Sequence, residues 1–175
     1  MKLEPVQAQD LQRLLTWVDS PEFLLQWAGP SLTWPLTRSQ LETLLLEAQR
    51  SAPTGQALKA VSDDGFMTGY AEIARIDRRN RSASIARVIV APESRGLGIG
   101  SWLVAELLWV AFEQLYLHRV SLNVLSFNTA AIRAYERTGF RHEGTLRDAY
   151  VVGGRFWSVN MMSILEPEWR KRDQR

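Results

Sequence analysis

The 175-residue chain contains no cysteine. This absence excludes disulfide bonds, thiolate metal ligands and a cysteine nucleophile. Histidine is scarce as well: His118 and His142 are the only two, and neither has a partner at the spacing of a metal site. We therefore predict no metal centre and treat both histidines as structural.

Long hydrophobic runs are also missing. The longest apolar stretch, residues 102–117, is interrupted by Glu106, Glu113 and Gln114, and a membrane-spanning helix needs roughly 18 apolar residues. The first five residues lack the apolar core of a signal peptide. We expect a cytoplasmic protein with no membrane partner.

Neither sign of charge dominates. The 21 basic and 19 acidic residues leave a formal charge of +2, which is too small an excess to indicate a nucleic-acid partner. Part of the excess lies in a basic tail, residues 166–175, which includes Arg170 and Arg175. We predict that this tail is solvated; nucleic-acid binding through it is the disfavoured alternative.

The remaining composition is that of one domain, with enough length for a hydrophobic core. The first part, about residues 1–55, reads as helical: Ser20-Pro21 fits a helix start, and Thr37 and Gln40 have the spacing of a capping box. Strand and helix patterns then alternate. Strands are expected at 57–62, 66–75, 84–91, 120–125, 140–151 and 155–165, and helices at 98–116 and 128–138. The chain is predicted to form an α/β layer structure around one sheet.

Three alternating glycines, Gly96, Gly98 and Gly100, join a β-branched strand to a helix. Glycine permits positive φ and close approach of a ligand, and the first amides of a helix lack partners and carry partial positive charge. The turn therefore predicts an anion site, to which Arg95 adds a charge-assisted contact. It lacks the lysine of a P-loop and the Gly-x-Gly-x-x-Gly spacing of dinucleotide folds. A turn that merely joins strand to helix is the alternative.

Residues 95–100, Arg-Gly-Leu-Gly-Ile-Gly, resemble the Arg/Gln-x-x-Gly-x-Gly/Ala signature of the GNAT N-acetyltransferase superfamily. Residues 128–140 resemble a second pattern of that family, Asn-x-x-Ala-x-x-x-Tyr-x-x-x-Gly-Phe. Glu143-Gly144 with Arg147 is similar to the branch that contains ribosomal-protein N-terminal and spermidine acetyltransferases. The resemblance covers about residues 57–165. It implies a GNAT fold: a single mixed, mostly antiparallel sheet with helices on both faces and a splayed parallel strand pair at the cofactor site.

The cofactor implied by the resemblance is acetyl-CoA. The strand before the turn would face the pantetheine arm, the turn amides would bind the pyrophosphate, and residues 120–125 would form the second splayed strand. The implied cofactor residues are Val88, Ile89, Val90, Arg95, Gly96, Leu97, Gly98, Ile99, Gly100, Ser101, Asn128, Ala131 and Tyr135. Seven helical residues turn through about 700°, so Asn128 and Tyr135 share nearly one face. Helix capping is the alternative role of Asn128.

The implied chemistry is direct attack of an amine on the thioester in a ternary complex. A backbone N–H near Ile89 or Val90 would polarise the carbonyl. Tyr135 would protonate the leaving thiolate, as a general acid; a core tyrosine with a satisfied hydroxyl is the alternative.

A general base is harder to assign. An alkyl amine with a pKa near 10 is neutral in about one molecule per thousand at neutral pH. Some family members place a glutamate on the strand before the turn, and residues 83–88 contain none. Glu72, expected on one face with Tyr70 and Ala74, is the best remaining candidate. Its favoured alternative is a solvent-facing carboxylate; a water-mediated base or capture of the free amine stays open.

The resemblance places the acceptor pocket between the N-terminal helices and the final hairpin. Their aromatic residues favour core packing over an aromatic pocket for a cationic amine: Trp17, Phe23, Trp27, Trp34, Tyr150, Phe156 and Trp157. Asp19 and Glu22 are candidates for negative charge there.

The predicted function is acetyl-CoA-dependent N-acetylation of a small amine, amino acid, polyamine or protein N-terminus. A non-catalytic acyl-CoA-binding regulatory module is the alternative. The seven tryptophans also suggest a homodimer.

Overall fold

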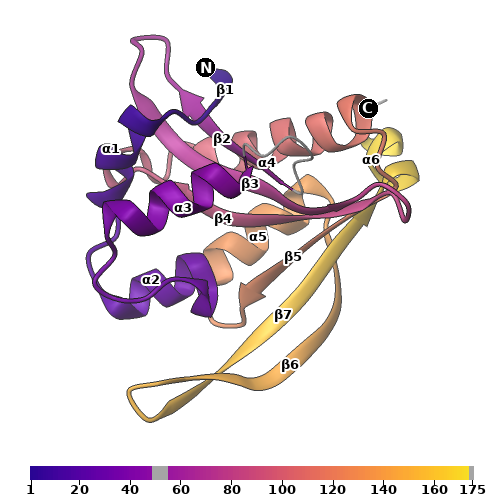
Figure 1. The fold of residues 1–175 in the computed structure, drawn as a ribbon. Coiled ribbons are helices and arrows are strands. Elements are labelled where there is room, and N and C mark those ends of the chain that lie inside the picture. The colour runs from indigo at the N-terminus through magenta and orange to yellow at the C-terminus, as the bar shows by residue number, and fades with distance from the viewer. Residues whose placement is uncertain (49–54, 174–175) are drawn as a thin grey trace.

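A seven-stranded sheet forms the centre of the molecule (Figure 1). The structure is a computed structural model that describes residues 1–48 and 55–173. The strands are β1 (Lys2–Pro5), β2 (Gly55–Val61), β3 (Met67–Asp77), β4 (Ser82–Val90), β5 (Arg119–Leu125), β6 (Arg141–Val152) and β7 (Arg155–Leu165). They lie in the order β1-β2-β3-β4-β5-β7-β6, and within the residues just given only β4 and β5 pair in parallel. This arrangement confirms the predicted mixed, mostly antiparallel sheet.

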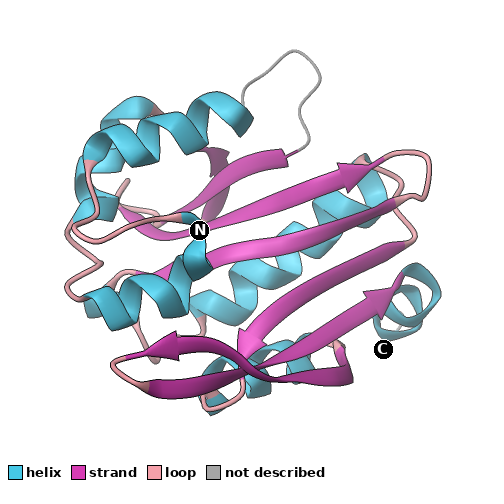
Figure 2. Ribbon diagram, turned by 60° about the horizontal axis from the view of Figure 1, so that its bottom comes forward, coloured by secondary structure: helices cyan, strands magenta, loops and turns pink. Residues whose placement is uncertain are grey.

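Helices cover both faces of the sheet (Figure 2). They are α1 (Leu11–Leu15), α2 (Pro21–Ala28), α3 (Arg38–Ala48), α4 (Ile99–Trp109), α5 (Thr129–Thr138) and α6 (Glu166–Asp173), with short turns η1 (Ala8–Asp10), η2 (Gly29–Ser31), η3 (Pro92–Ser94) and η4 (Val110–Gln114). One core packs α4 against β3, β4 and β5 through residues such as Leu103 and Ile73. A second core packs α1, α2 and α3 on residues such as Tyr70 and Ile89.

The N-terminal part differs from the sequence prediction in one element. Ser20 caps α2 as expected, since its hydroxyl accepts the amide of Phe23 at 3.3 Å. The first residues, however, form β1, which pairs antiparallel with β2. This strand escaped detection because it has only four residues, ends in Pro5 and lies at the sheet edge without a clear alternation of burial.

The predicted helix over residues 98–116 is wrong at its C-terminal end. The α-helix stops at Trp109 and a π-helical turn follows, in which the Leu115 amide donates to the Val110 carbonyl at 2.9 Å. Phe112 stays buried through this turn, so the apolar pattern continues past the end of the α-helix.

Most of the basic tail is also folded. Residues 166–173 form α6, whose Trp169 packs on Phe112 with ring centroids 5.3 Å apart. Arg170 at its surface pairs with Glu113 and Glu166, and Arg175 lies outside the described residues. Within residues 1–48 and 55–173, no helix has the length and hydropathy needed to cross a bilayer.

The parallel pair β4–β5 separates soon after it begins. Pairing is confined to three residue pairs, from Ser82–Arg119 to Ser84–Ser121. Beyond it, β4 runs on to Val90 beside β3, and β5 runs on to Leu125 beside β7. A β-bulge bends β4 at Arg87, which has φ +51°, where the register against β3 shifts. The expected splayed strand pair is therefore present (Figure 1).

Candidate active site

A cavity of about 520 Å³ opens where β4 meets the N-terminus of α4. It is lined by Val88, Ile89 and Val90 of β4, by Arg95, Gly96, Gly98, Ile99, Gly100 and Ser101 of the glycine turn, and by Asn128, Ala131 and Tyr135 of α5. The structure thus brings together every predicted cofactor residue except Leu97, whose side chain is 74% exposed outside the cavity. From α2, Phe23, Gln26 and Trp27 close the opposite wall.

The glycine turn has the backbone geometry of an anion cradle. Gly96 and Gly98 adopt φ of +81° and +80°, a region where a side chain would be strained. A Cβ atom added to either would have no neighbour within 4 Å, so the space beside the turn is open. The first bond of α4 runs from the Trp102 amide to the Gly98 carbonyl. The preceding amides of the helix start therefore remain available for a phosphate, and the residues present fit the pyrophosphate of coenzyme A.

Arg95 links the turn to α2. Its Nε donates to the Val90 carbonyl at 3.3 Å, and its guanidinium lies 5.3 Å from the centre of the Phe23 ring. The guanidinium of Arg95 is thus held at the rim of the cavity, where it can bind a phosphate in addition to the amides of the turn.

The face of α5 that carries Asn128 and Tyr135 points into the same cavity. Asn128 caps the helix, since its Oδ1 accepts the Ala131 amide at 3.2 Å, and it also lines the cavity wall. Burial raises the pKa of the Tyr135 hydroxyl to about 12. In the described part of the chain no protein group hydrogen-bonds this hydroxyl. The alternative of a tyrosine satisfied in the core therefore does not fit, and the proton of Tyr135 remains available to a group in the cavity.

A second cavity, of about 300 Å³, lies on the other side of the splay. Its walls come from α2, η2, the C-terminal part of β3, the middle of β4, the end of β5, Tyr150 of β6 and Val159 of β7. Gln26 and Trp27 line both cavities, and along β4 the second cavity ends at Arg87 where the first begins at Val88. Trp27 fixes this junction, because its Nε1 donates to the Arg87 carbonyl at 2.7 Å. The two cavities therefore meet at the β4 bulge.

Glu72 lies beneath this junction and is only 7% exposed. Arg87 binds its carboxylate with two bonds of 2.7 Å, from Nε to Oε1 and from Nη2 to Oε2. The Tyr70 hydroxyl donates to Oε1 as well, and burial, followed by the charge of Glu72, raises the pKa of Tyr70 well above its usual value. The interpretation of Glu72 as a solvent-facing residue is thus wrong. Its carboxylate is occupied by these bonds and lines neither cavity.

Arginines, rather than acids, give the second cavity its charge. Arg75 of β3 and Arg87 of β4 line it, whereas Asp19 and Glu22, the acids predicted for this role, lie before or at the start of α2 and do not. Sequence reasoning missed both arginines. The only signal was an arginine interrupting each strand pattern; both have positive φ, +54° and +51°, which marks bulges that strand periodicity does not reveal.

The predicted acceptor aromatics divide between several places. Trp27 and Tyr150 line the second cavity and Phe23 lines the first. Trp17 is buried in the core beneath α1 and α2. The others lie away from both cavities: Trp34 and Phe156 are exposed, and Trp157 packs edge-on against Phe127. Core packing thus accounts for only part of this set.

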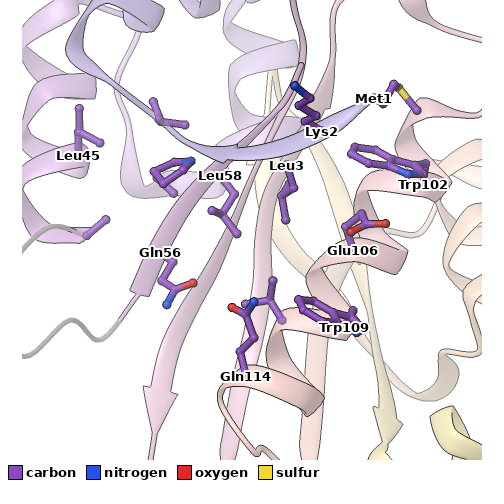
Figure 3. A pocket seen from close by; sticks show the side chains of 15 residues that line it. Met1, Lys2, Leu3, Leu45, Gln56, Leu58, Trp102, Glu106, Trp109 and Gln114 are labelled. Carbon is purple, nitrogen blue, oxygen red and sulfur yellow. The ribbon is translucent and has the colours of Figure 1, made fainter. Parts of the chain in front are cut away.

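A third cavity, of about 690 Å³, lies elsewhere in the fold. Figure 3 shows Trp102, Glu106 and Trp109 of α4 facing Leu3 of β1 and Leu58 of β2 across it. It shares no lining residue with the other two, so it lies outside the path between them. Among the described residues, no group of three or more histidine, aspartate or glutamate side chains has the arrangement of a metal site.

Comparison with known proteins shows to which family the chain belongs. The model of the acetyltransferase (GNAT) family matches residues 21–140. The chain is 33% identical to a spermidine N(1)-acetyltransferase of Vibrio cholerae over 62% of both chains. It is 32% identical to a phosphinothricin N-acetyltransferase of Streptomyces coelicolor, over 73% of this chain and 75% of that protein. The match thus spans less than two thirds of the first relative and three quarters of the second.

A solved structure matches over nearly the whole fold. The spermidine N-acetyltransferase of Vibrio cholerae, crystallised with CoA and spermine, superposes with a TM-score of 0.85 at 25% identity, over 97% of each chain. This chain and that protein accordingly share one fold. The chain belongs to the GNAT family, whose members are N-acetyltransferases that use acetyl-CoA.

Proposed function

We propose that the enzyme holds acetyl-CoA in the cavity beside the glycine turn and receives a primary amine from the cavity on the other side of the splay. The free amine nitrogen attacks the thioester carbonyl, a C–N bond forms and the C–S bond breaks. Tyr135 protonates the leaving thiolate, and the proton that the nitrogen loses returns to Tyr135 through solvent, so amide and free thiol form with no net change in protons. The observation that carries this proposal is the meeting of the two cavities at Arg87 and Val88, which would bring nucleophile and thioester together without a covalent enzyme intermediate.

The residues that line the first cavity have separate roles in binding acetyl-CoA and in the reaction. The turn from Gly96 to Ser101 binds the pyrophosphate through backbone amides. The backbone of Val88 to Val90, which does not pair with β5, orients the pantetheine arm. A backbone N–H near Ile89 or Val90 polarises the carbonyl. Tyr135 gives its proton to the leaving thiolate; its pKa of about 12 keeps it protonated at any working pH.

Glu72 has a different role in this proposal from the base first considered. Its carboxylate is filled by Arg87 and Tyr70, so we assign it the positioning of Arg87. Within the described chain, the lining of the acceptor cavity contains no carboxylate and no imidazole. The amine therefore enters as the free base or loses its proton to water.

The acceptor belongs to small amines, in line with the spermine that the Vibrio cholerae structure contains. We place the enzyme in the cytoplasm and propose that it forms a homodimer. The support for the dimer is the β6–β7 hairpin, which extends from the body of the molecule (Figure 1) and exposes Leu146, Val151 and Phe156. Light scattering during size exclusion measures this directly.

Tyr135→Phe tests the proposal. Thiol release from acetyl-CoA is measured with a panel of amines, and CoA affinity by calorimetry. We expect kcat to fall by about 100-fold or more, the usual contribution of a general acid, with unchanged CoA affinity. Thr138→Val, a change on the same helix outside the cavity lining, is the control. Unchanged kcat in Tyr135→Phe would remove the acid from the scheme; CoA binding without turnover in the unaltered enzyme would favour the regulatory module.

A further inference from the structure

The charge of the acceptor cavity is positive. Its ionisable lining residues are two arginines and one tyrosine, Arg75, Arg87 and Tyr150, and in the described chain no carboxylate joins them. The other polar groups that line it are Gln26, Ser31 and Asn123. A cavity of this composition offers several hydrogen-bond donors to an anion and no counter-charge to a cation.

Arg75 carries most of the uncompensated charge. Its Nη2 donates to the Ser84 hydroxyl at 3.0 Å, and that neutral contact is its only side-chain bond among residues 1–48 and 55–173. No carboxylate of the described chain lies within ion-pair distance of it. The Arg75 residue is exposed, so its remaining donors are accessible from the open cavity.

Arg87 is neutralised in part but keeps a donor free. Two of its nitrogens bind Glu72, and the third, Nη1, has only a 3.4 Å contact with the Ser31 hydroxyl. Desolvation lowers the pKa of Arg87, but the bonds to Glu72 and the charges of Glu72, Tyr70 and Glu47 outweigh it and raise the pKa. Arg87 is therefore a fixed cation, oriented by a buried carboxylate at the junction of the two cavities.

We propose that the acceptor carries a carboxylate as well as its primary amine, and that Arg75 and the free Nη1 of Arg87 bind this carboxylate. This inference rests on the proposed function, since it names the class of amine that enters the second cavity. Guanidinium groups bind carboxylates through paired N–H donors. A polyamine, by contrast, would bring a second ammonium group to two arginines.

The test compares acceptors that differ in the group beside the amine. Because amidation of the carboxylate also lowers the pKa of the amine, kcat/KM is expressed per neutral amine. Thiol release is measured with the free amino acids, with their amides, which lack the carboxylate, and with diamines and spermidine. We expect kcat/KM for the best amino acid to exceed that of its amide by about tenfold or more, the fold-change of a charge-assisted hydrogen bond. Arg75→Gln should abolish most of this preference by raising KM, and Arg75→Lys should retain part of it.

Arg78→Gln is the matched control. It removes the same charge three positions along the chain, from an exposed loop residue that lines neither cavity, and it should leave the preference intact. A preference for spermidine over amino acids, or an acid-over-amide preference that survives Arg75→Gln, would overturn the inference.

A second measurement separates this inference from the proposed function. If no amine is acetylated, binding of amino acids and their amides to the CoA-loaded protein is measured by calorimetry. Binding of the acids that depends on Arg75 would support the charged acceptor site even though the catalytic proposal had failed. Absence of such binding at millimolar concentration would overturn it.

Discussion

The Glu72–Arg87 pair provides the sharpest test of how the site is supported. Both partners are largely buried, with side-chain exposures of 9% and 17%, and two bonds of 2.7 Å join them. Glu72→Gln keeps the shape but removes the negative charge, which leaves the guanidinium of Arg87 without a counter-ion. Removing one partner of a buried pair costs about 3–5 kcal/mol. Because Arg87 reaches the cavity, we expect the lower end, about 3 kcal/mol.

The assays are urea unfolding, which gives the free energy of unfolding, and thermal unfolding, which gives Tm, both followed by tryptophan fluorescence. For a chain of this length, a loss of about 3 kcal/mol corresponds to a fall in Tm of about 6–12 °C. Glu42→Gln is the control, because Glu42 makes a bond of the same 2.7 Å length to Arg38, but both side chains are 44–45% exposed. An exposed helical pair of this kind contributes about 0.3–0.5 kcal/mol. If Glu72→Gln lowered the free energy of unfolding no more than Glu42→Gln does, burial would not strengthen the Glu72–Arg87 pair, and our reasoning would be refuted.

Kinetics of the same variant separate positioning from base catalysis. A positioning residue changes the KM for the acceptor and leaves the pH dependence of kcat as it was. Loss of a general base lowers kcat by about 100-fold or more, and the loss shrinks at high pH, where the amine is already neutral. Recovery of Glu72→Gln at high pH would therefore return Glu72 to the role of base and refute our assignment.

Three further outcomes follow from the described geometry. Gly98→Ala should lower the free energy of unfolding by about 1–2 kcal/mol and weaken CoA binding. Gly65→Ala, at a φ of +88° and outside the cavity lining, should lower stability alone. Hydrogen bonds from Arg119 and then Ser163 lower the pKa of Glu143 from 4.5 to about 2. The stabilisation by this pair is therefore complete above about pH 4.5 and is lost as the pH falls through 2. At 38% exposure of Glu143 it amounts to less than about 1 kcal/mol, and acid titration of Glu143→Gln should lack this component. Finally, kcat/KM should rise about tenfold per pH unit up to the pKa of the amine, because no residue of the described chain that lines the acceptor cavity can act as a base. A plateau near pH 7 would reveal a base.

The glycine turn and the capped helix α5 could be predicted because their requirements are local. Gly98 is needed by its own φ, and Asn128 caps the helix that it precedes. Such features depend on residues next to one another in the chain. The resemblance to the family then joined the two segments into one site, which the structure brings together around a single cavity.

The acceptor side was less predictable because it depends on strand register. Ala86 lies opposite Glu72, and Ile89 lies opposite Tyr70, only because a bulge intervenes at Arg87. A shift of one residue in β4 reverses the face on which each side chain lies. The sequence therefore offered Glu72 as a candidate base, with a solvent-facing carboxylate as the favoured alternative. It supplied no reason to expect Arg87 as the partner of Glu72 or Arg75 in the cavity.

The bulge at Arg87 connects both halves of the proposed reaction. An arginine at positive φ is strained, and here three interactions hold it: the Glu72 carboxylate, the Trp27 indole on its carbonyl, and the pairing of β4 with β3. The strained bulge has a structural consequence: it changes the face of β4 on which the side chains after Arg87 lie. Arg87 lines the acceptor cavity while Val88 lines the cofactor cavity. In the proposed reaction, residues adjacent in sequence would contact the two substrates, so the backbone rather than a mobile side chain would set the position of the acceptor relative to the thioester.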